Sequence, residues 1–300
     1  MISVTSMDPE RVGEPGQAFV PMKRTLIIGD IHGCIDELND LCALVGPDHV
    51  VSVGDMVDRG PDSQGVWRFF RERDDATAIL GNHEQKCLRW HTEDLKPALS
   101  QRITRAQHGE SAWDEACCWF ATLPRFLELP ECTVVHGFWR PGAAVQDQHP
   151  SVITGTMSGQ KRVEGLGRPW YELYDGPKPL VVGHAIYDGE RALVHRDRVY
   201  GVDTGCVHGM RLTGLVVPEF RLFSVPARRD WWTHVRRQHP ALRLADIEPA
   251  KLVWEDAEST LKSLRGDPRG QDKVQDVERM LAQASADEEA LLTAVEEEHA

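Results

Sequence analysis

Six side chains that can bind a metal ion each follow a short apolar run of the chain: Asp30, His32, Asp55, Asn82, His136 and His184. Asp30 and His32 stand two residues apart, so in an extended segment both leave the same face and can bind one ion. Asp55 has two carboxylate oxygens and can bridge to a second ion, whose site Asn82 and the two later histidines would complete. Oxygen and nitrogen donors without thiolate suit manganese, iron or zinc, and argue against a zinc finger or an iron–sulfur cluster. The residues therefore predict two divalent metal ions side by side.

The apolar runs themselves predict the elements that position these side chains. They are short, rich in β-branched residues and bounded by glycine, and they cover residues 25–28, 50–53, 77–80, 133–135 and 180–182. Such runs predict strands that are buried on both faces, as in an α/β protein. Strands of this kind present functional groups at the carboxyl edge of the sheet. We therefore expect the six ligands to converge at one edge.

The ligand segments form a series of motifs in fixed order. The series is G-D-x-H-G from Gly29, G-D-x-V-D-R-G from Gly54, G-N-H-E from Gly81, V-H-G at His136 and G-H at His184. It closely resembles the calcineurin-like metallophosphoesterases, in particular the branch with the PPP-type Ser/Thr phosphatases and the bacterial diadenosine tetraphosphatases. The resemblance spans roughly residues 24–217. It departs from the family at Phe138 and Met210, where relatives carry a small residue and a glycine.

The resemblance implies a catalytic role for three further residues. The family uses the histidine after the ligand asparagine, here His83, to protonate the leaving oxygen, and Asp58 is its natural orienting partner. Arg59 offers a planar fork of donors for two phosphate oxygens, and Asn82 would contact the substrate as well as a metal ion. Two metal ions, Mn²⁺ first with iron or zinc as alternatives, would activate a hydroxide that attacks phosphorus in line.

The resemblance also implies the fold, an α/β sandwich of two mixed β-sheets flanked by helices. We expect residues 1–22 to be a flexible lead-in, because they carry no apolar segment of the kind found in a signal peptide. Residues 23–226 would form the metallophosphoesterase domain, and residues 227–300 a mainly helical, acidic C-terminal extension. An apolar stripe within the extension, at residues 274–284, either docks on a protein partner or caps the domain.

Composition limits the remaining choices. The chain has 300 residues and a formal net charge of -13. An acidic chain is a poor general nucleic-acid binder, because nonspecific affinity comes from neutralising phosphates. No apolar run approaches the ~20 residues of a membrane span, so we expect no membrane association. Seven cysteines without C-x-x-C spacing indicate reduced thiols and a cytoplasmic location.

Between Glu84 and Cys132 the apolar spacing becomes helical. Because this segment interrupts the ligand-bearing strands, we expect it near the mouth of the site. Its basic residues would either meet a phosphorylated substrate or form an ordinary solvated face, and we favour the second interpretation for Arg89, Lys96, Arg102 and Arg105. For Trp170, Tyr171 and Tyr174 we likewise favour core packing over the stacking of a base.

The function predicted first is hydrolysis of a phosphomonoester, with phosphoserine and phosphothreonine proteins prominent, because the motif residues already supply all that it needs. The alternative is a bis(5'-nucleosyl)-tetraphosphatase that hydrolyses diadenosine tetraphosphate. The substrate is accordingly a phosphorylated protein or a nucleotide. A remote third hypothesis is a non-catalytic metal-binding scaffold, which the presence of both Asp58 and His83 disfavours, since a scaffold needs no proton donor.

Overall fold

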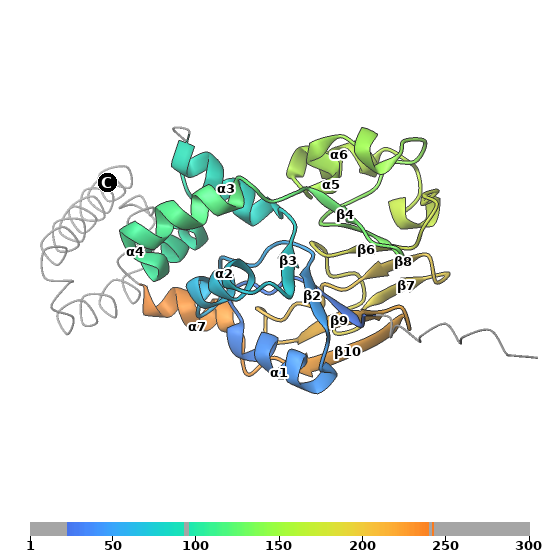
Figure 1. Ribbon diagram of the computed structural model, residues 1–300. Coiled ribbons are helices and arrows are strands. Elements are labelled where there is room, and N and C mark those ends of the chain that lie inside the picture. Colours follow the sequence, from blue (N-terminus) through green and yellow to red (C-terminus); the bar gives the residue numbers. More distant parts are fainter. Residues whose placement is uncertain (1–22, 93–95, 240–241, 243–300) are drawn as a thin grey trace, which may run out of the picture.

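Two five-stranded β-sheets pack face to face, with helices outside them (Figure 1). The computed structural model describes residues 23–92, 96–239 and 242. The flexible lead-in predicted for residues 1–22 and the apolar stripe predicted for residues 274–284 lie outside these residues. The predicted α/β class with two mixed sheets is confirmed.

The first sheet has the strand order β10-β9-β1-β2-β3. Its parallel centre is made by the first three strands of the chain, and β9 and β10 are antiparallel additions beside β1. The strands are β1 (Thr25–Ile28), β2 (His49–Ser52), β3 (Ala76–Ala78), β9 (Arg211–Val217) and β10 (Arg221–Pro226).

The second sheet has the order β4-β5-β6-β8-β7. Here β5, β6 and β8 run parallel, while β4 and β7 are antiparallel strands at the two edges. The strands are β4 (Phe126–Glu128), β5 (Thr133–Val135), β6 (Leu180–Val182), β7 (Leu193–His195) and β8 (Val199–Gly201). All five predicted strands are present, as β1, β2, β3, β5 and β6.

Seven α-helices and two short 3₁₀ helices are present in the described part of the chain. The α-helices are α1 (Ile35–Val45), α2 (Ser63–Glu72), α3 (Asn82–Thr92), α4 (Leu99–Phe120), α5 (Pro150–Ile153), α6 (Met157–Glu164) and α7 (Trp231–Gln238); the 3₁₀ helices are η1 (Val145–Asp147) and η2 (Trp170–Leu173). Side-chain caps start four of the described α-helices, because Asp62, His149, Thr156 and Asp230 each accept a hydrogen bond from a backbone N–H in the first turn.

The alternation of side chains along the strands builds three apolar layers. In β1, Ile27 faces the second sheet and packs with residues such as Val51, Val134 and Val181. Leu26 and Ile28 point the other way, into a layer shared with α1, α2 and α4. A third layer lies between the second sheet and α5, α6 and η2. This packing fixes the ends of the strands relative to one another.

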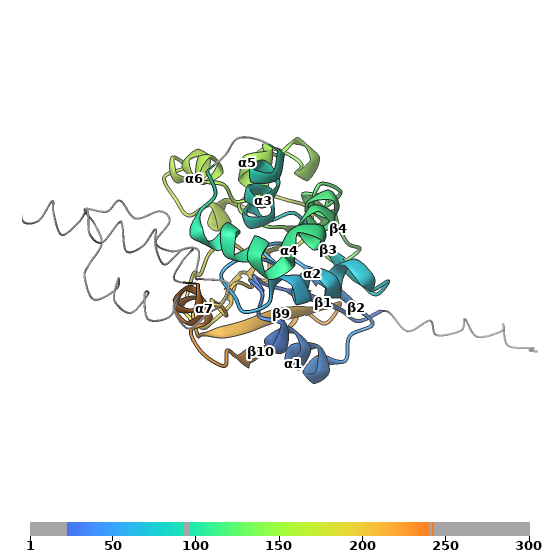
Figure 2. The same ribbon diagram turned by 90° about the vertical axis from the view of Figure 1, so that its left-hand side faces the viewer.

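The segment between Glu84 and Cys132 is helical, as predicted, and forms α3 and α4. Figure 2 shows the two helices crossing in front of the first sheet. Gly109, at φ +70°, kinks α4, a backbone conformation that glycine adopts without steric cost. Within the described ranges, no helix is both long and apolar enough to span a membrane.

Candidate active site

The six predicted metal ligands lie together, in the loops that follow β1, β2, β3, β5 and β6. Asp55 is at the centre of the group. One of its carboxylate oxygens lies 3.3 Å from Nε2 of His136, 3.8 Å from Nε2 of His32 and 3.9 Å from Nε2 of His83. This central position is the one that the bridging role predicted for Asp55 requires.

The other donors surround Asp55 on two sides. Oδ1 of Asn82 lies 3.0 Å from Nε2 of His136 and 2.9 Å from Nδ1 of His184. On the opposite side, Oδ2 of Asp30 lies 4.0 Å from Nε2 of His32, while its Oδ1 accepts a hydrogen bond from the backbone N–H of His184. The donors thus form two groups that share Asp55.

Two backbone carbonyls orient the imidazoles. Nδ1 of His32 donates to the carbonyl of Val57 at 2.8 Å, and Nδ1 of His136 donates to the carbonyl of Val53 at 3.0 Å. Because a carbonyl can only accept, each Nδ1 carries a proton and each Nε2 faces Asp55. Such outer partners fix the ring orientation and tautomer of metal-binding histidines.

Left-handed backbone conformations concentrate at the site. Among the described residues, eight that are not glycine have a positive φ, and five of these are His32, Asp55, Asp58, Arg59 and His184. Each costs conformational free energy and persists only because its surroundings enforce it. The tight turns that result point these side chains into the cluster instead of along their strands.

The ionisable groups of the cluster perturb one another strongly. Burial and the nearby carboxylates of Asp203 and Asp55 raise the pKa of Asp30 well above its usual value. Burial, Arg59 and His83 lower the pKa of His32, and burial with His136 lowers the pKa of His184 to about 3. These two imidazoles are therefore neutral at physiological pH and can donate a nitrogen lone pair.

His136 shows the opposite behaviour. Although burial lowers its pKa, Asp55, Asp30 and Glu84 outweigh that effect and raise it to about 10. The buried imidazole of His136 is therefore protonated at physiological pH, beside Asp55. Buried carboxylates packed this closely need a compensating positive charge, which a proton supplies here and a divalent cation would supply better. The donor set therefore fits divalent metal ions.

The predicted pair of Asp58 and His83 is also formed. Nδ1 of His83 lies 2.6 Å from Oδ2 of Asp58, and both residues are buried. Two residues of α4 that we did not predict complete the surroundings of Asp58, since Gln101 donates to Oδ2 and Thr104 donates to Oδ1. The carboxylate is thus held from two sides while it orients the imidazole.

Glu84 organises the loop that carries Asp55. Its two carboxylate oxygens accept hydrogen bonds from the backbone N–H groups of Asp55, Met56, Val57 and Gly81, at 2.8–3.1 Å. The side chain is fully buried. Glu84 therefore joins the loop after β2 to the loop after β3, in agreement with the loop-stabilising role that its position after His83 suggests.

Replacing this carboxylate tests its structural role. In Glu84→Gln, an NH₂ group would replace a carboxylate oxygen that accepts hydrogen bonds from two backbone N–H groups. Those two N–H groups would lose their acceptor, and buried donors without partners are costly. We expect the free energy of unfolding to fall by about 3 kcal/mol, measured by urea denaturation. The control is Glu115→Gln, at an exposed position of α4. Equal stability of both variants would contradict the role given to Glu84.

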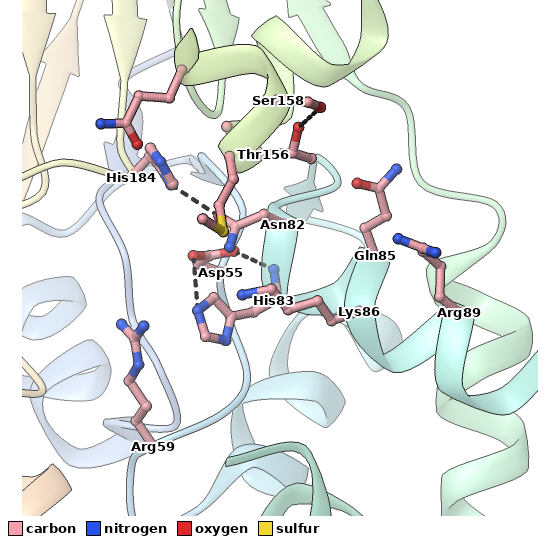
Figure 3. A pocket seen from close by; sticks show the side chains of 13 residues that line it. Asp55, Arg59, Asn82, His83, Gln85, Lys86, Arg89, Thr156, Ser158 and His184 are labelled. Atoms are coloured by element: carbon pink, nitrogen blue, oxygen red, sulfur yellow. Dashed lines mark hydrogen bonds and ion pairs between the residues drawn. The ribbon is translucent and has the colours of Figure 1, made fainter. Parts of the chain in front are cut away.

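Arg59 lies at the edge of the cluster, and its Nη1 donates to Nε2 of His32 at 3.1 Å. With Asp55, Asn82, His83 and His184 it lines a cavity of about 450 Å³ (Figure 3). The guanidinium therefore faces the space in which a substrate would meet the cluster.

The predictions for the neighbouring side chains have mixed outcomes. Arg89 lines the cavity, whereas Arg105 pairs with Glu110 at 2.7 Å and lies over the ring of Trp90. Trp170 is buried against Phe138, as expected for core packing. Phe138 also contacts the edge of the His184 ring, so its departure from the family pattern changes the margin of the site.

Comparison with known families agrees with this geometry. A model of the calcineurin-like phosphoesterase family matches residues 23–256. The chain belongs to this family. Calcineurin-like phosphoesterases use divalent metal ions, which fits the donor cluster around Asp55.

Individual relatives carry more specific names. Two are symmetrical bis(5'-nucleosyl)-tetraphosphatases: the one from Shewanella baltica strain OS155 is 36% identical over 109 residues, and the one from Psychromonas ingrahamii is 34% identical over 116 residues. These matches cover 35% and 37% of this chain, and 39% and 42% of the relatives' own length. A crystal structure of a candidate diadenosine tetraphosphatase is 30% identical, with a TM-score of 0.56, over 68% of this chain and 94% of that one.

Proposed function

We propose that this calcineurin-like phosphoesterase hydrolyses a phosphoanhydride bond of a dinucleoside polyphosphate such as diadenosine tetraphosphate. The observation that carries the chemistry is the buried pair of His83 and Asp58, directly beside the donor cluster around Asp55. The substrate class rests on the tetraphosphatases among its relatives. These relatives favour our alternative prediction over the phosphomonoester that the motifs placed first.

Two divalent ions would be held by the six donors, with Asp55 between them. Asp30, His32 and Asp55 would bind one ion; Asp55, Asn82, His136 and His184 would bind the other. When bound, such a pair lowers the pKa of a shared water and neutralises the phosphoryl oxygens. We propose Mn²⁺ as the first candidate, with iron or zinc as alternatives, because the donors are oxygen and imidazole nitrogen.

The side chains of the chain itself would bind the phosphoryl group and supply a proton. Arg59 lines the cavity and presents a planar fork of donors to two phosphate oxygens. Nε2 of His83 faces the cluster, so it can protonate the leaving oxygen, while Asp58 holds Nδ1 and stabilises the imidazolium. The amide of Asn82 lies in the same wall and would contact the phosphoryl group as well.

A phosphomonoester, including a phosphoserine or phosphothreonine side chain, is the second candidate. It is supported by the fact that Arg59, His83 and the donor cluster would serve such a substrate without further contacts. A non-catalytic scaffold is disfavoured, because a buried His83 and Asp58 pair costs desolvation and adds nothing to metal binding.

A parallel measurement of kcat/KM separates these candidates, because that ratio reports differential binding of the transition state. The substrates are diadenosine tetraphosphate, a nucleoside monophosphate and a phosphoserine peptide, at fixed Mn²⁺. We expect the tetraphosphate to be preferred by about 100-fold or more, equivalent to about 2.7 kcal/mol, and chelation of the metal to abolish all three activities. A preference for the peptide would restore the phosphomonoester as the substrate, and activity that survives chelation would refute the metal-dependent mechanism.

A further inference from the structure

One face of α3 continues away from the donor cluster. The helix begins at Asn82, and residues three, four and seven positions later share a face with it. These residues are Gln85, Lys86 and Arg89, and all three line the same cavity as Asn82. Figure 3 shows them along the helix beside His83. At 1.5 Å per residue, Lys86 lies about 6 Å and Arg89 about 10 Å along the helix axis from Asn82.

The charged side chains that line this cavity are mostly cationic. Among the described residues that line it, Arg59, Lys86 and Arg89 carry permanently cationic side chains, and Asp55 is the only one with a carboxylate. The whole chain has a formal net charge of -13, with 47 acidic residues against 34 lysines and arginines. The described lining of the cavity is thus cationic apart from Asp55, which favours an anionic ligand.

The opposite wall of the cavity carries no charged side chain among its described residues. It is formed by the start of α6, with Gly155, Thr156, Met157 and Ser158. Thr156 caps the helix by accepting from the N–H of Gly159, so the partial positive charge of the helix end also lies on this side. Gly155 has φ +71°, and a Cβ there would lie 2.8 Å from the ring of His184. The wall therefore approaches the cluster closely and leaves the α3 face to bind a charged group.

The position of His83 indicates which part of a substrate lies against these cations. Lys86 follows His83 by three residues on the same helix, and both line the cavity. Since His83 is the proposed proton donor to the leaving oxygen, a leaving group that extends along α3 from that oxygen meets this face of the helix. A leaving group with further phosphates would place them beside Lys86 and then Arg89.

We propose that Lys86 and Arg89 form a subsite for the phosphates of the leaving group, so that the site selects substrates in which the scissile phosphate is followed by a chain of phosphates. This inference rests on the proposed function. It deepens that function by assigning specificity to two side chains outside the metal and acid machinery. The ligand class is a linear oligophosphate, either free or as the end of a nucleotide.

Inhibition by inorganic phosphates tests the subsite without a nucleotide. Orthophosphate and tripolyphosphate are each used as inhibitors of the hydrolysis of p-nitrophenyl phosphate at constant free Mn²⁺. The inhibition constant of orthophosphate divided by that of tripolyphosphate measures how much the phosphates beyond the first add to binding. In Lys86→Met we expect tripolyphosphate to lose about tenfold of its advantage over orthophosphate, since a charge-assisted contact disappears. Arg89→Gln should also lower this ratio, and thermal unfolding checks that the variant protein is folded.

The matched control is Lys161→Met, an exposed lysine of α6 that does not line the cavity. It carries the same change of charge and side chain, so its ratio should equal that of the parent. If Lys86→Met leaves the ratio unchanged, or if Lys161→Met lowers it equally, the subsite is refuted.

The kcat/KM for diadenosine tetraphosphate, measured on the same preparations, separates the two proposals. A parent that does not prefer the tetraphosphate, with a Lys86→Met variant that still loses its tripolyphosphate advantage, would refute the proposed function and support the subsite. A parent that prefers the tetraphosphate, with no change of ratio in Lys86→Met, would support the function and refute the subsite.

Discussion

Asp55→Asn is expected to lower kcat/KM for any phosphate substrate by about 10³-fold, because Asp55 lies between the two groups of donors and a neutral amide cannot compensate two cations. The loss should accompany a lower content of bound metal. Steady-state kinetics and elemental analysis of the dialysed protein measure the two effects. The surrounding histidines at 3.3–3.9 Å from the carboxylate would lose their common partner.

An appropriate control is Asp114→Asn, at an exposed position of α4, which removes the same charge far from the donor loops. It should keep both its activity and its metal. Parental activity in Asp55→Asn would disprove the two-metal arrangement, whatever the metal content of that variant.

His83→Asn should separate proton donation from metal binding. We expect it to retain metal and to lose about 10²–10⁴-fold in rate on alkyl phosphates, which is the usual contribution of a positioned general acid. The loss should be smaller on p-nitrophenyl phosphate, whose leaving group scarcely needs a proton. Comparing kcat on both substrates, together with metal content, measures this difference.

A different result would reassign His83. Its Nε2 lies 3.9 Å from Asp55, and its donor atoms lie within 4.8 Å of those of His32 and Asp55. If the His83→Asn variant loses its metal and its kcat falls equally on both substrates, then His83 is a metal ligand and not the general acid.

The convergence of the six predicted donors could be foreseen because each follows the end of a strand by no more than four residues. Asp30 stands two residues after β1, and His136 directly follows β5. The bounds of both strands match the predicted runs, whereas β2 begins one residue earlier than predicted. A buried apolar run determines where its strand ends, and parallel strands bring those ends together. Local sequence was therefore sufficient for this part of the site.

The partners of Asp58 could not be predicted in this way. Gln101 and Thr104 lie 43 and 46 residues further along the chain, and they reach Asp58 only because α4 packs across α2 and α3. No motif marks them, although their spacing of three residues places both on one helix face. Asp203, which raises the pKa of Asp30, was likewise not among the predicted site residues.

The charged face of α3 was available in the sequence, but we interpreted Arg89 as part of a solvated face and did not single out Lys86. The spacing from Asn82 to Lys86 and Arg89 already placed these residues on the side of a predicted ligand. What the sequence lacked was the start of α6, which closes the opposite side of the cavity. The edge strands β4 and β7 were missed for another reason, since they are short and only partly buried, with weak apolar patterns.

The origin of the donors in both sheets has a consequence for unfolding. Asp30, Asp55 and Asn82 follow strands of the first sheet, whereas His136 and His184 follow strands of the second. The first sheet carries the three donors proposed for one ion, but the proposed donors of the second ion come from both sheets, so a partly folded chain with separated sheets lacks the second site. Because that second ion would favour only the docked state, it would increase the cooperativity between the two halves of the sandwich and protect the apolar layer between them from opening.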